Sequence, residues 1–409
     1  YNEVREGVFT MSFIKIPTKG MRDIMPEDMA LREYVLKVMK DTYENFGFEL
    51  IQTPCVEHIE NLTSKQGGDN EKLIFKILKR GEKLDIENVT NMDNLVDSGL
   101  RYDLTVPLTR FYAGNMNELQ SPFRAFQIGN VYRADRPQRG RYREFMQCDL
   151  DIFGEKTNLG EIELISAVTS FLKKLNFDGF QIKINDRRIL TSMALSAGFE
   201  EEDLESILIS LDKLDKIGFD GVLEELISHG YDENIVNRYL NYFKQELSYE
   251  DFCAQFTIDG AIVKNLKEIM EVSSAVTKAN VIFDPTLVRG MGYYTGPIFE
   301  IGVEDLNSSI GGGGRYDNMV ANYTSISVPA VGFSVGFERL VLLLKERGFE
   351  IPSNKKKIAF VINEKTEDVF LQAKNLRLNG NIVKIVMRSK NFKHQKETLL
   401  EKGYEIIEM

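Results

Sequence analysis

One stretch of the chain concentrates residues that suit phosphate chemistry. It runs from Phe123 to Gly154, FRAFQIGNVYRADRPQRGRYREFMQCDLDIFG, and holds five arginines and one acid, Asp135, within eleven residues. The arginines are Arg133, Arg136, Arg139, Arg141 and Arg143. A guanidinium group offers a planar fork of donors that matches phosphate oxygens. Because the whole chain carries a net charge of -11, this local excess of arginine favours phosphate binding over a solvated basic face.

The same stretch turns acidic directly after the arginines, at Asp149 and Asp151. A polyanion and a small cation could therefore be held next to each other. The apolar runs IGNVY and DLDIF bracket the arginines and predict two strands of a hairpin, with the arginines at its tip. A packed scaffold would then present the basic patch.

Two later motifs also have residue types that suit a ligand site. In LVRGMGYYTGPIFE (287–300), Arg289 follows an apolar run, and two glycines clear space beside Tyr293 and Tyr294. In SSIGGGGRYDNMV (308–320), four consecutive glycines allow a ligand to approach the backbone closely. Such a glycine run alone fits a flexible loop equally well. It is not a dinucleotide-binding fingerprint, because the G-x-G-x-x-G spacing is missing.

The composition limits the class of protein. A length of 409 residues predicts two or three domains, and 43% apolar residues are enough for real cores. No apolar stretch reaches the roughly 18 to 20 residues of a membrane span, and YNEVREGVFTMSF lacks the features of a secretory signal. We therefore expect a cytoplasmic protein without a membrane partner. Residues 1–11 are interpreted as an N-terminal extension, with Met11 as a candidate natural start.

The cysteines and histidines do not suggest a site. Cys55, Cys148 and Cys253 are far apart and lack CxxC spacing, so neither a disulfide framework nor a zinc site is predicted, and no metal ligand is assigned. The histidines lie outside every motif and are interpreted as structural or surface residues: His58, His229 and His394.

Apolar periodicity predicts the elements that must hold these motifs. A helix is expected over 28–46, followed by a strand bent at Pro54 that could form a subunit contact. KLIFKILKRGEKL (72–84) predicts a hairpin that turns at Arg80 and Gly81, with a loop from there to Ser98. Short amphipathic segments between 187 and 278 predict a helical insertion. Strands are expected over 279–303, and a strand followed by a helix over 328–347.

The last part of the chain has its own pattern. After IPSNKKK the sequence alternates strand, helix, strand, helix and strand, which predicts a small α/β domain with a parallel sheet. From Lys355 onward, twelve Lys and Arg residues stand against seven Asp and Glu residues, a local charge of +5. Nucleic acid is a reasonable partner for such a domain, although a solvated surface would show the same charge.

Taken together, the motifs resemble those of the histidyl-tRNA synthetases, a branch of the class II aminoacyl-tRNA synthetases. The resemblance covers nearly the whole chain from about Ile16. It rests on five segments in the family's order: LRYDLTVPLTR, VYRADRPQRGRYREFMQCDLDIFG, LVRGMGYYTG, GGGGRYD and VGFSVGFERL. It implies an α+β fold with an antiparallel six-stranded sheet flanked by helices, a helical insertion domain and a C-terminal anticodon-binding α/β domain, assembled as a homodimer. The implied domain bounds are 12–185 and 279–350 for the catalytic core, 186–278 for the insertion and 355–409 for the C-terminal domain.

The resemblance also implies which residues bind ATP. Arg133 matches the arginine that grips the α-phosphate, and Arg289 matches the second catalytic arginine, which in this family does work that a metal ion does elsewhere. Phe145 and Arg339 should sandwich the adenine. Arg141, with help from Arg136, should meet the outer phosphates. Mg²⁺ is expected to accompany ATP, although no carboxylate cluster in the sequence singles out its ligands.

The amino-acid side of the site is implied in the same way. Asp103, Thr105 and Gln147 should hold the α-ammonium of histidine, and Asp151 and Tyr294 should read its imidazole. The remaining residues of the implied pocket are Arg289, Tyr293, Gly312, Gly313 and Tyr316. Each residue also has an ordinary interpretation: Asp103 and Asp151 as turn caps or arginine partners, and Phe145 as core. Because Tyr293 and Tyr294 would alternate across a strand, only one of them is expected to line the pocket.

The implied function is that of a histidine–tRNA ligase, with histidine, ATP and tRNA(His) as partners. Two features depart from the family: Gly292 stands where an Asp is usual, and the C-terminal domain is short, ending at Met409 after its third strand. The alternative is the synthetase-like regulatory subunit of ATP phosphoribosyltransferase, which does not charge tRNA. The presence of Arg133, Gln147, Arg289 and Arg339 favours the enzyme. A nucleotide-binding scaffold without catalysis would leave the arginine pair unexplained.

Overall fold

A computed structural model describes residues 14–63, 73–84, 86, 91–138, 140–290, 292–303 and 309–409. The chain divides into two compact units, one ending at Gly348 and the other spanning Phe349–Met409. Each unit is described by itself. None of the described helices is both long enough and apolar enough to cross a bilayer.

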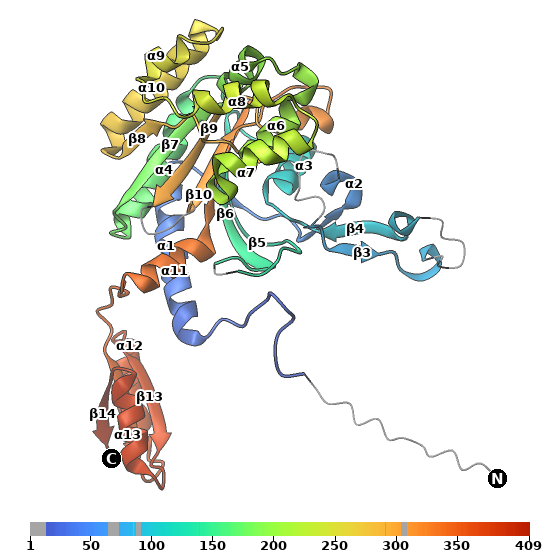
Figure 1. Ribbon diagram of the computed structural model, residues 1–409. Helices are drawn as coiled ribbons and strands as arrows, with labels where there is room; N and C mark the ends of the chain where they lie inside the picture. Colours follow the sequence, from blue (N-terminus) through green and yellow to red (C-terminus); the bar gives the residue numbers. More distant parts are fainter. Residues whose placement is uncertain are drawn as a thin grey trace, which may run out of the picture. The chain divides into compact units, whose positions relative to one another are not determined.

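A sheet of eight strands forms the centre of the first unit (Figure 1), in the order β1-β5-β6-β11-β10-β9-β7-β8. Their bounds are β1 (Glu49–Ile51), β5 (Phe123–Tyr132), β6 (Glu144–Phe153), β7 (Phe180–Asp186), β8 (Asn280–Phe283), β9 (Pro297–Val303), β10 (Gly311–Arg315) and β11 (Ala330–Gly336). The six inner strands pair antiparallel, whereas β1 and β8 pair parallel at the two edges. The predicted antiparallel six-stranded sheet is confirmed, with one extra strand at each edge.

Helices pack on this sheet through apolar faces. α1 (Pro26–Glu44) begins with proline and then two acids, which suits a helix N-terminus. Its buried Tyr43 ring contacts Phe126 on β5 and Phe171 on α4 (Leu159–Lys174), at centroid distances of 5.0 and 5.7 Å. α11 (Phe337–Glu346) follows β11, as predicted for 328–347. The hairpin predicted around the arginines is also confirmed, as β5 and β6.

A second, small antiparallel sheet differs from the sequence-based prediction. Its order is β2-β4-β3, with β2 (Val56–His58), β3 (Lys76–Leu78) and β4 (Val96–Leu100). The hairpin predicted within 72–84 is wrong, because β3 pairs with β4 and Gly81–Lys83 forms a 3₁₀ turn. The loop predicted to reach Ser98 includes a second 3₁₀ turn, Met92–Leu95, and the start of β4. Lys72, Asp85 and residues 87–90 lie outside the described residues.

Proline explains a second difference. The strand predicted to bend at Pro54 is split into β1 and β2, which belong to different sheets. Proline has no N–H to donate to a ladder, so the pairing stops there. Helix α2 (Ile59–Leu62) follows the outer strand β2, and helix α3 (Thr105–Asn115) follows the central strand β4.

Helices fill the segment in which the sequence predicts an insertion. They are α5 (Arg187–Ala197), α6 (Leu204–Leu211), α7 (Leu214–Ser228), α8 (Glu233–Tyr242), α9 (Tyr249–Cys253) and α10 (Gly260–Thr277), with a 3₁₀ turn at Glu201–Asp203. Side chains of Asp186, Asp232, Ser248 and Asp259 cap helix N-termini here. The segment leaves from β7 and returns in β8, and such a parallel pair requires a long crossover. A further 3₁₀ turn, Val320–Asn322, follows β10.

The second unit is a three-stranded parallel sheet in the order β13-β12-β14. Its elements are β12 (Lys357–Ile362), α12 (Glu367–Leu378), β13 (Ile382–Met387), α13 (Phe392–Glu401) and β14 (Tyr404–Glu408). The central strand is buried on both faces: Phe360 packs with residues of α12, and Val361 packs with Leu399 of α13. The predicted strand and helix alternation is confirmed.

Candidate active site

Two cavities adjoin on the face of the large sheet. The larger, about 450 Å³, is lined by the arginine-bearing hairpin, by α11 and by the insertion. The smaller, about 110 Å³, lies among β6, β10, β11 and the segment before β9. Five residues line both cavities: Arg133, Gln147, Arg289, Gly312 and Ser334. These five define the junction at which two ligands would meet.

The larger cavity is rich in cations. Arg133, Arg141, Arg289 and Arg339 line it, together with Lys213 and Lys216 of the insertion. Tyr102 helps to orient Arg133, whose Nε donates to the Tyr102 carbonyl oxygen at 2.9 Å. The predicted adenine partners, Phe145 and Arg339, both line this cavity. The sequence-predicted Arg136 lines neither cavity, and Arg139 lies outside the described residues.

Arg289 is held by an acid that the family motif does not predict. Its Nη1 donates to Glu300 Oε2 on β9 at 2.8 Å. Burial acts to lower the pKa of Arg289, but Tyr294, Glu300 and Asp212 together raise it above its ordinary value. Gly292, in place of the usual Asp, is exposed to solvent. Glu300 therefore supplies a carboxylate that orients the arginine.

The smaller cavity is rich in acids. Asp103, Asp149 and Asp151 line it, and each is 2% exposed. Burial raises the pKa of Asp103 to about 6 and that of Asp151 to about 7, although the Tyr316 hydroxyl, which donates to Asp151, opposes the second shift. Burial and the nearby Asp151 also raise the pKa of Asp149. A cationic ligand would relieve the cost of burying these carboxyl groups together.

Several buried atoms of this cavity have no hydrogen-bond partner. They are Asp103 Oδ2, Gln147 Oε1, Asp151 Oδ2 and Arg289 Nε, among the described residues. An unpaired buried polar atom costs about 1 to 3 kcal/mol, so each needs an explanation. Three acceptors and one donor facing a single small cavity indicate a ligand that carries several N–H groups and an anionic group.

Two neighbouring tyrosines line the smaller cavity, where the sequence pattern predicted only one. Tyr293 and Tyr294 both line it, although only one was expected to do so. They lie in an irregular segment before β9, so the side-chain alternation of a strand does not apply. Their ring centroids are 4.8 Å apart, and Tyr293 lies 5.9 Å from Tyr316. Thr105 completes this side of the cavity.

The glycine run forms β10 and supplies part of the cavity wall. A Cβ atom on Gly313 would lie 1.9 Å from the carbonyl oxygen of Gly332 on β11. A Cβ atom on Gly312 would lie 2.6 Å from Arg289 Nη1. Glycine is thus required for close approach in a regular strand, and the flexible-loop interpretation is wrong.

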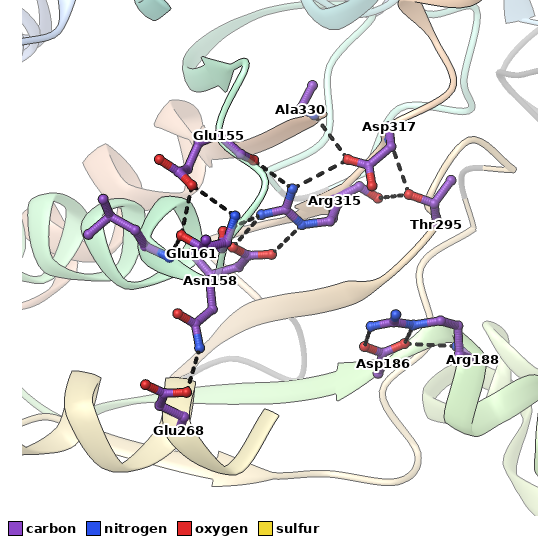
Figure 2. Close-up of polar contacts among 12 residues, drawn as sticks. Glu155, Asn158, Glu161, Asp186, Arg188, Glu268, Thr295, Arg315, Asp317 and Ala330 are labelled. Atoms are coloured by element: carbon purple, nitrogen blue, oxygen red, sulfur yellow. Dashed lines mark hydrogen bonds and ion pairs between the residues drawn. The ribbon is translucent and has the colours of Figure 1, made fainter. Parts of the chain in front are cut away.

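A buried ion pair anchors this wall from behind (Figure 2). Arg315, at the end of β10, donates from Nε and Nη2 to the two carboxylate oxygens of Glu161 on α4, both at 2.7 Å. Its Nη1 donates to the Glu155 carbonyl oxygen at 3.0 Å. Asp317 meanwhile accepts from the Ala330 backbone N–H at 3.0 Å. The next residue after Arg315 is Tyr316, so the anchor fixes the backbone that carries this partner of Asp151.

Sequence reasoning missed some of the lining residues. Ser334 was not among the predicted site residues, and Asp149 was noted only as part of the acidic turn that could hold a small cation, yet both line the smaller cavity. A signal for Asp149 existed, because Gln147, Asp149 and Asp151 follow the two-residue period of one strand face. Asp212, Lys213 and Lys216 left no signal, since only tertiary packing brings the insertion to the cavity.

Comparisons with known proteins identify the family of this chain. The family model for histidyl-tRNA synthetase matches residues 20–340. The histidine–tRNA ligase of Leifsonia xyli subsp. xyli is 44% identical over 347 residues, which cover 80% of each chain. A probable histidine–tRNA ligase of Tropheryma whipplei is 38% identical over 95% of this chain and 94% of its own length. The chain therefore belongs to the histidyl-tRNA synthetase family, as the motifs predicted.

Solved structures share the fold. The histidyl-tRNA synthetase from Nostoc sp. PCC 7120 superimposes with a TM-score of 0.76 at 24% identity, covering 97% of this chain and 92% of that one. A protein from Bacillus halodurans, described as an ATP phosphoribosyltransferase regulatory subunit/histidyl-tRNA synthetase, gives a TM-score of 0.77 at 22% identity, covering 97% of this chain and 98% of that one. At these identities the likeness shows the fold alone.

Proposed function

We propose that the two cavities bind ATP and histidine side by side, and that the chain joins them as histidyl-adenylate before transferring the histidyl group to tRNA(His). Histidine–tRNA ligation is the function of the family, and the proposal assigns its steps to side chains. The observation that carries it is that Arg133 and Arg289 line both cavities. The α-phosphate of ATP and the carboxylate of histidine must meet at such a junction.

The first step is attack by the histidine carboxylate on the α-phosphorus of ATP, with pyrophosphate leaving. Negative charge gathers on the non-bridging oxygens in the transition state. Arg133 and Arg289 would stabilise this charge without reorganising, because Tyr102 and Glu300 already orient them. Arg141 would meet the outer phosphates, whereas Arg136, which lines neither cavity, is left out of this contact. Phe145 and Arg339 would enclose the adenine. No protein nucleophile takes part.

Histidine would occupy the smaller cavity. Asp103, Thr105 and Gln147 would accept from the α-ammonium, while Asp151 and Tyr294 would contact the imidazole. Gly312, Gly313, Tyr293 and Tyr316 would form the wall. Asp151 Oδ2 is buried without a partner, so a substrate that lacks an imidazole N–H would leave it unpaired. This penalty gives the site its preference for histidine.

The second step needs tRNA. Once the adenylate is formed, transfer to the terminal ribose depends mainly on positioning. We assign residues 355–409, which lie in the second unit and carry a local charge of +5, to anticodon contact. We assign residues 186–278 to an insertion domain and residues 12–185 with 279–350 to the catalytic core. The proposed reaction is cytoplasmic.

Mg²⁺ belongs to the proposal only as an ion that ATP brings. The described residues include no group of three or more His, Cys, Asp or Glu side chains that could hold a metal ion. The steps above are assigned to the arginines, and no ligand from the protein is assigned to Mg²⁺.

A homodimer is the remaining part of the proposal. β1 is an edge strand of the large sheet, and its Leu50 is 55% exposed. Val56 on β2 is 48% exposed, so apolar side chains of this region face solvent in the single chain. Edge strands and exposed apolar residues favour pairing with a second copy. Light scattering after size exclusion would test it, and a monomeric mass at micromolar concentration would reject it.

Histidine-dependent exchange of pyrophosphate into ATP tests the central proposal. We expect exchange with histidine and none with other amino acids. If well-folded protein shows no exchange with any amino acid yet still binds histidine, the non-charging regulatory function becomes the better assignment.

A further inference from the structure

Three side chains in the smaller cavity form a chain of hydrogen bonds, and the proposed function assigns a role only to its last member, Gln147. Asp149 on β6 and Ser334 on β11 stand directly opposite each other in the antiparallel register. The Ser334 hydroxyl donates to Asp149 Oδ1. Gln147 lies two residues before Asp149, on the same strand face, and its Nε2 donates to Ser334 Oγ at 2.7 Å.

The direction of each bond follows from the donors available. A hydroxyl has a single hydrogen, and Asp149, when it is ionised beside a bound ammonium, can only accept, so the Ser334 hydrogen then goes to Asp149. Ser334 Oγ can then only accept from Gln147, which must present its NH₂ group. The other end of the Gln147 amide, Oε1, is buried without a partner, and Gln147 lines both cavities.

We propose that Asp149, acting through Ser334, fixes the Gln147 amide so that its carbonyl oxygen accepts a hydrogen bond from the α-ammonium of the amino acid. Asp149 and Ser334 are thus positioning residues for recognition of a primary ammonium group. The inference rests on the proposed function, because it concerns the same substrate. A turned amide would point its NH₂ group at the ammonium, and two donors repel each other.

The hydrogen bonds from Gln147 to Ser334 and from Ser334 to Asp149 are well placed to orient the Gln147 amide. Asp149 is 2% exposed, so water does not compete for Ser334. Its negative charge also lies in the cavity that would receive the ammonium, beside Asp103 and Asp151. Burial and Asp151 favour the protonated form of Asp149, and a bound cation would oppose them. A bound ammonium would therefore keep Asp149 ionised, and ionised Asp149 would in turn keep the Gln147 carbonyl oxygen directed at the ammonium.

The test compares two ligands in two proteins by calorimetry. The ligands are histidine and imidazole-4-propionate, which lacks only the α-amino group. In the wild type we expect loss of that group to weaken binding about 100-fold or more, since several acceptors lose a charged donor. Ser334→Ala cuts the chain without changing charge, and we expect the penalty to shrink about tenfold, the worth of one hydrogen bond to a charged group.

Tyr316→Phe is the matched control from the same cavity. It removes the donor to Asp151 at the imidazole end, so it should weaken both ligands by the same factor and leave the penalty unchanged. Ser334→Thr keeps the hydroxyl and should keep most of the penalty. Retained ATP binding and the thermal midpoint would report folding of each variant.

An unchanged penalty in Ser334→Ala, or an equal loss for both ligands, would overturn the inference. If Ser334→Ala does not fold, the same ratio in Ser334→Cys decides, because a thiol is close in size to the hydroxyl, changes no charge and is only a weak donor and acceptor, and an unchanged penalty there counts against the inference equally. A wild type that binds no histidine would instead reject the proposed function.

Discussion

The two adjoining cavities carry opposite charge and were read from the sequence with different success. Arg133 and Arg141 line the larger cavity and stand out in the arginine-rich hairpin, whereas Arg339 was assigned through the family resemblance. The smaller cavity takes Asp149 and Asp151 from β6, where the turn to acid was visible, and Asp103 from the segment before α3, where a single Asp looks ordinary. A run of several charged residues in one hairpin is thus visible in the sequence, whereas isolated residues such as Asp103 and Lys213 reach their cavities only through the fold.

The largest effect on the reaction rate should come from removing a residue that lines both cavities. Arg289→Ala should lower histidine-dependent pyrophosphate exchange about 10³-fold, because it removes a fixed cation from the transition state. Histidine affinity by calorimetry should change far less. Arg188→Ala is the control: Arg188 also pairs with an acid, Asp186 at 2.6 Å, but lines neither cavity. Unchanged turnover in Arg289→Ala would show that the arginine has no catalytic role.

A change confined to the acidic cavity should act on only one ligand. Asp151→Ala should weaken histidine about 100-fold, because the imidazole N–H loses a charged acceptor. ATP affinity should stay within about twofold, since Asp151 does not line the larger cavity. Calorimetry with each ligand measures both. Equal losses for ATP and histidine would contradict the division of the site into two cavities.

A change in pH should also affect histidine binding and ATP binding differently. The folded pKa of Asp151, about 7, lies above its ordinary 3.8, so the unliganded protein holds this proton and loses stability as pH rises from about 4 to about 7. Histidine binding needs the ionised form, so affinity should fall about tenfold from pH 8 to pH 6. ATP titrations should show no such acid step. Because the substrate imidazole also titrates, Asp151→Asn is the reference, and the same pH slope there would remove Asp151 as the cause.

A smaller effect should distinguish two arginines of the hairpin. Arg141→Ala should raise the KM for ATP about fivefold, the worth of one partly exposed charge contact. Arg136→Ala should change it by less than about twofold, because Arg136 lines neither cavity. Steady-state exchange kinetics would compare them directly. The reverse order would place Arg136 on the phosphates in the bound state.

The smallest effect concerns the acid that orients Arg289. Glu300→Gln should lower the exchange rate about threefold, because it replaces a charged partner at 2.8 Å by a neutral acceptor. Adding Gly292→Asp to that variant restores the carboxylate that the family usually has in this loop, and part of the rate should return. A double variant no faster than Glu300→Gln would show that the loop cannot deliver an acid to Arg289.

The fold was predictable where one pattern decided it. The β5 and β6 hairpin and the alternation of the second unit follow from local periodicity. The hairpin within 72–84 failed because β3 finds its partner in β4, across a segment without clear period. Tyr293 and Tyr294 were assigned to a strand that begins only at Pro297. Asp212 was out of reach, since its position on the cavity depends on how the insertion packs.

The glycine strand β10 has a consequence for the protein's evolution. A side chain at Gly313 would overlap the backbone of Gly332, and one at Gly312 would overlap Arg289. We therefore expect no neutral single substitution at either position. In a library of all single variants, these two positions should tolerate as few substitutions as Arg289 does, although the glycines contribute no chemical group. Selection at this wall therefore retains glycine because no side chain fits there.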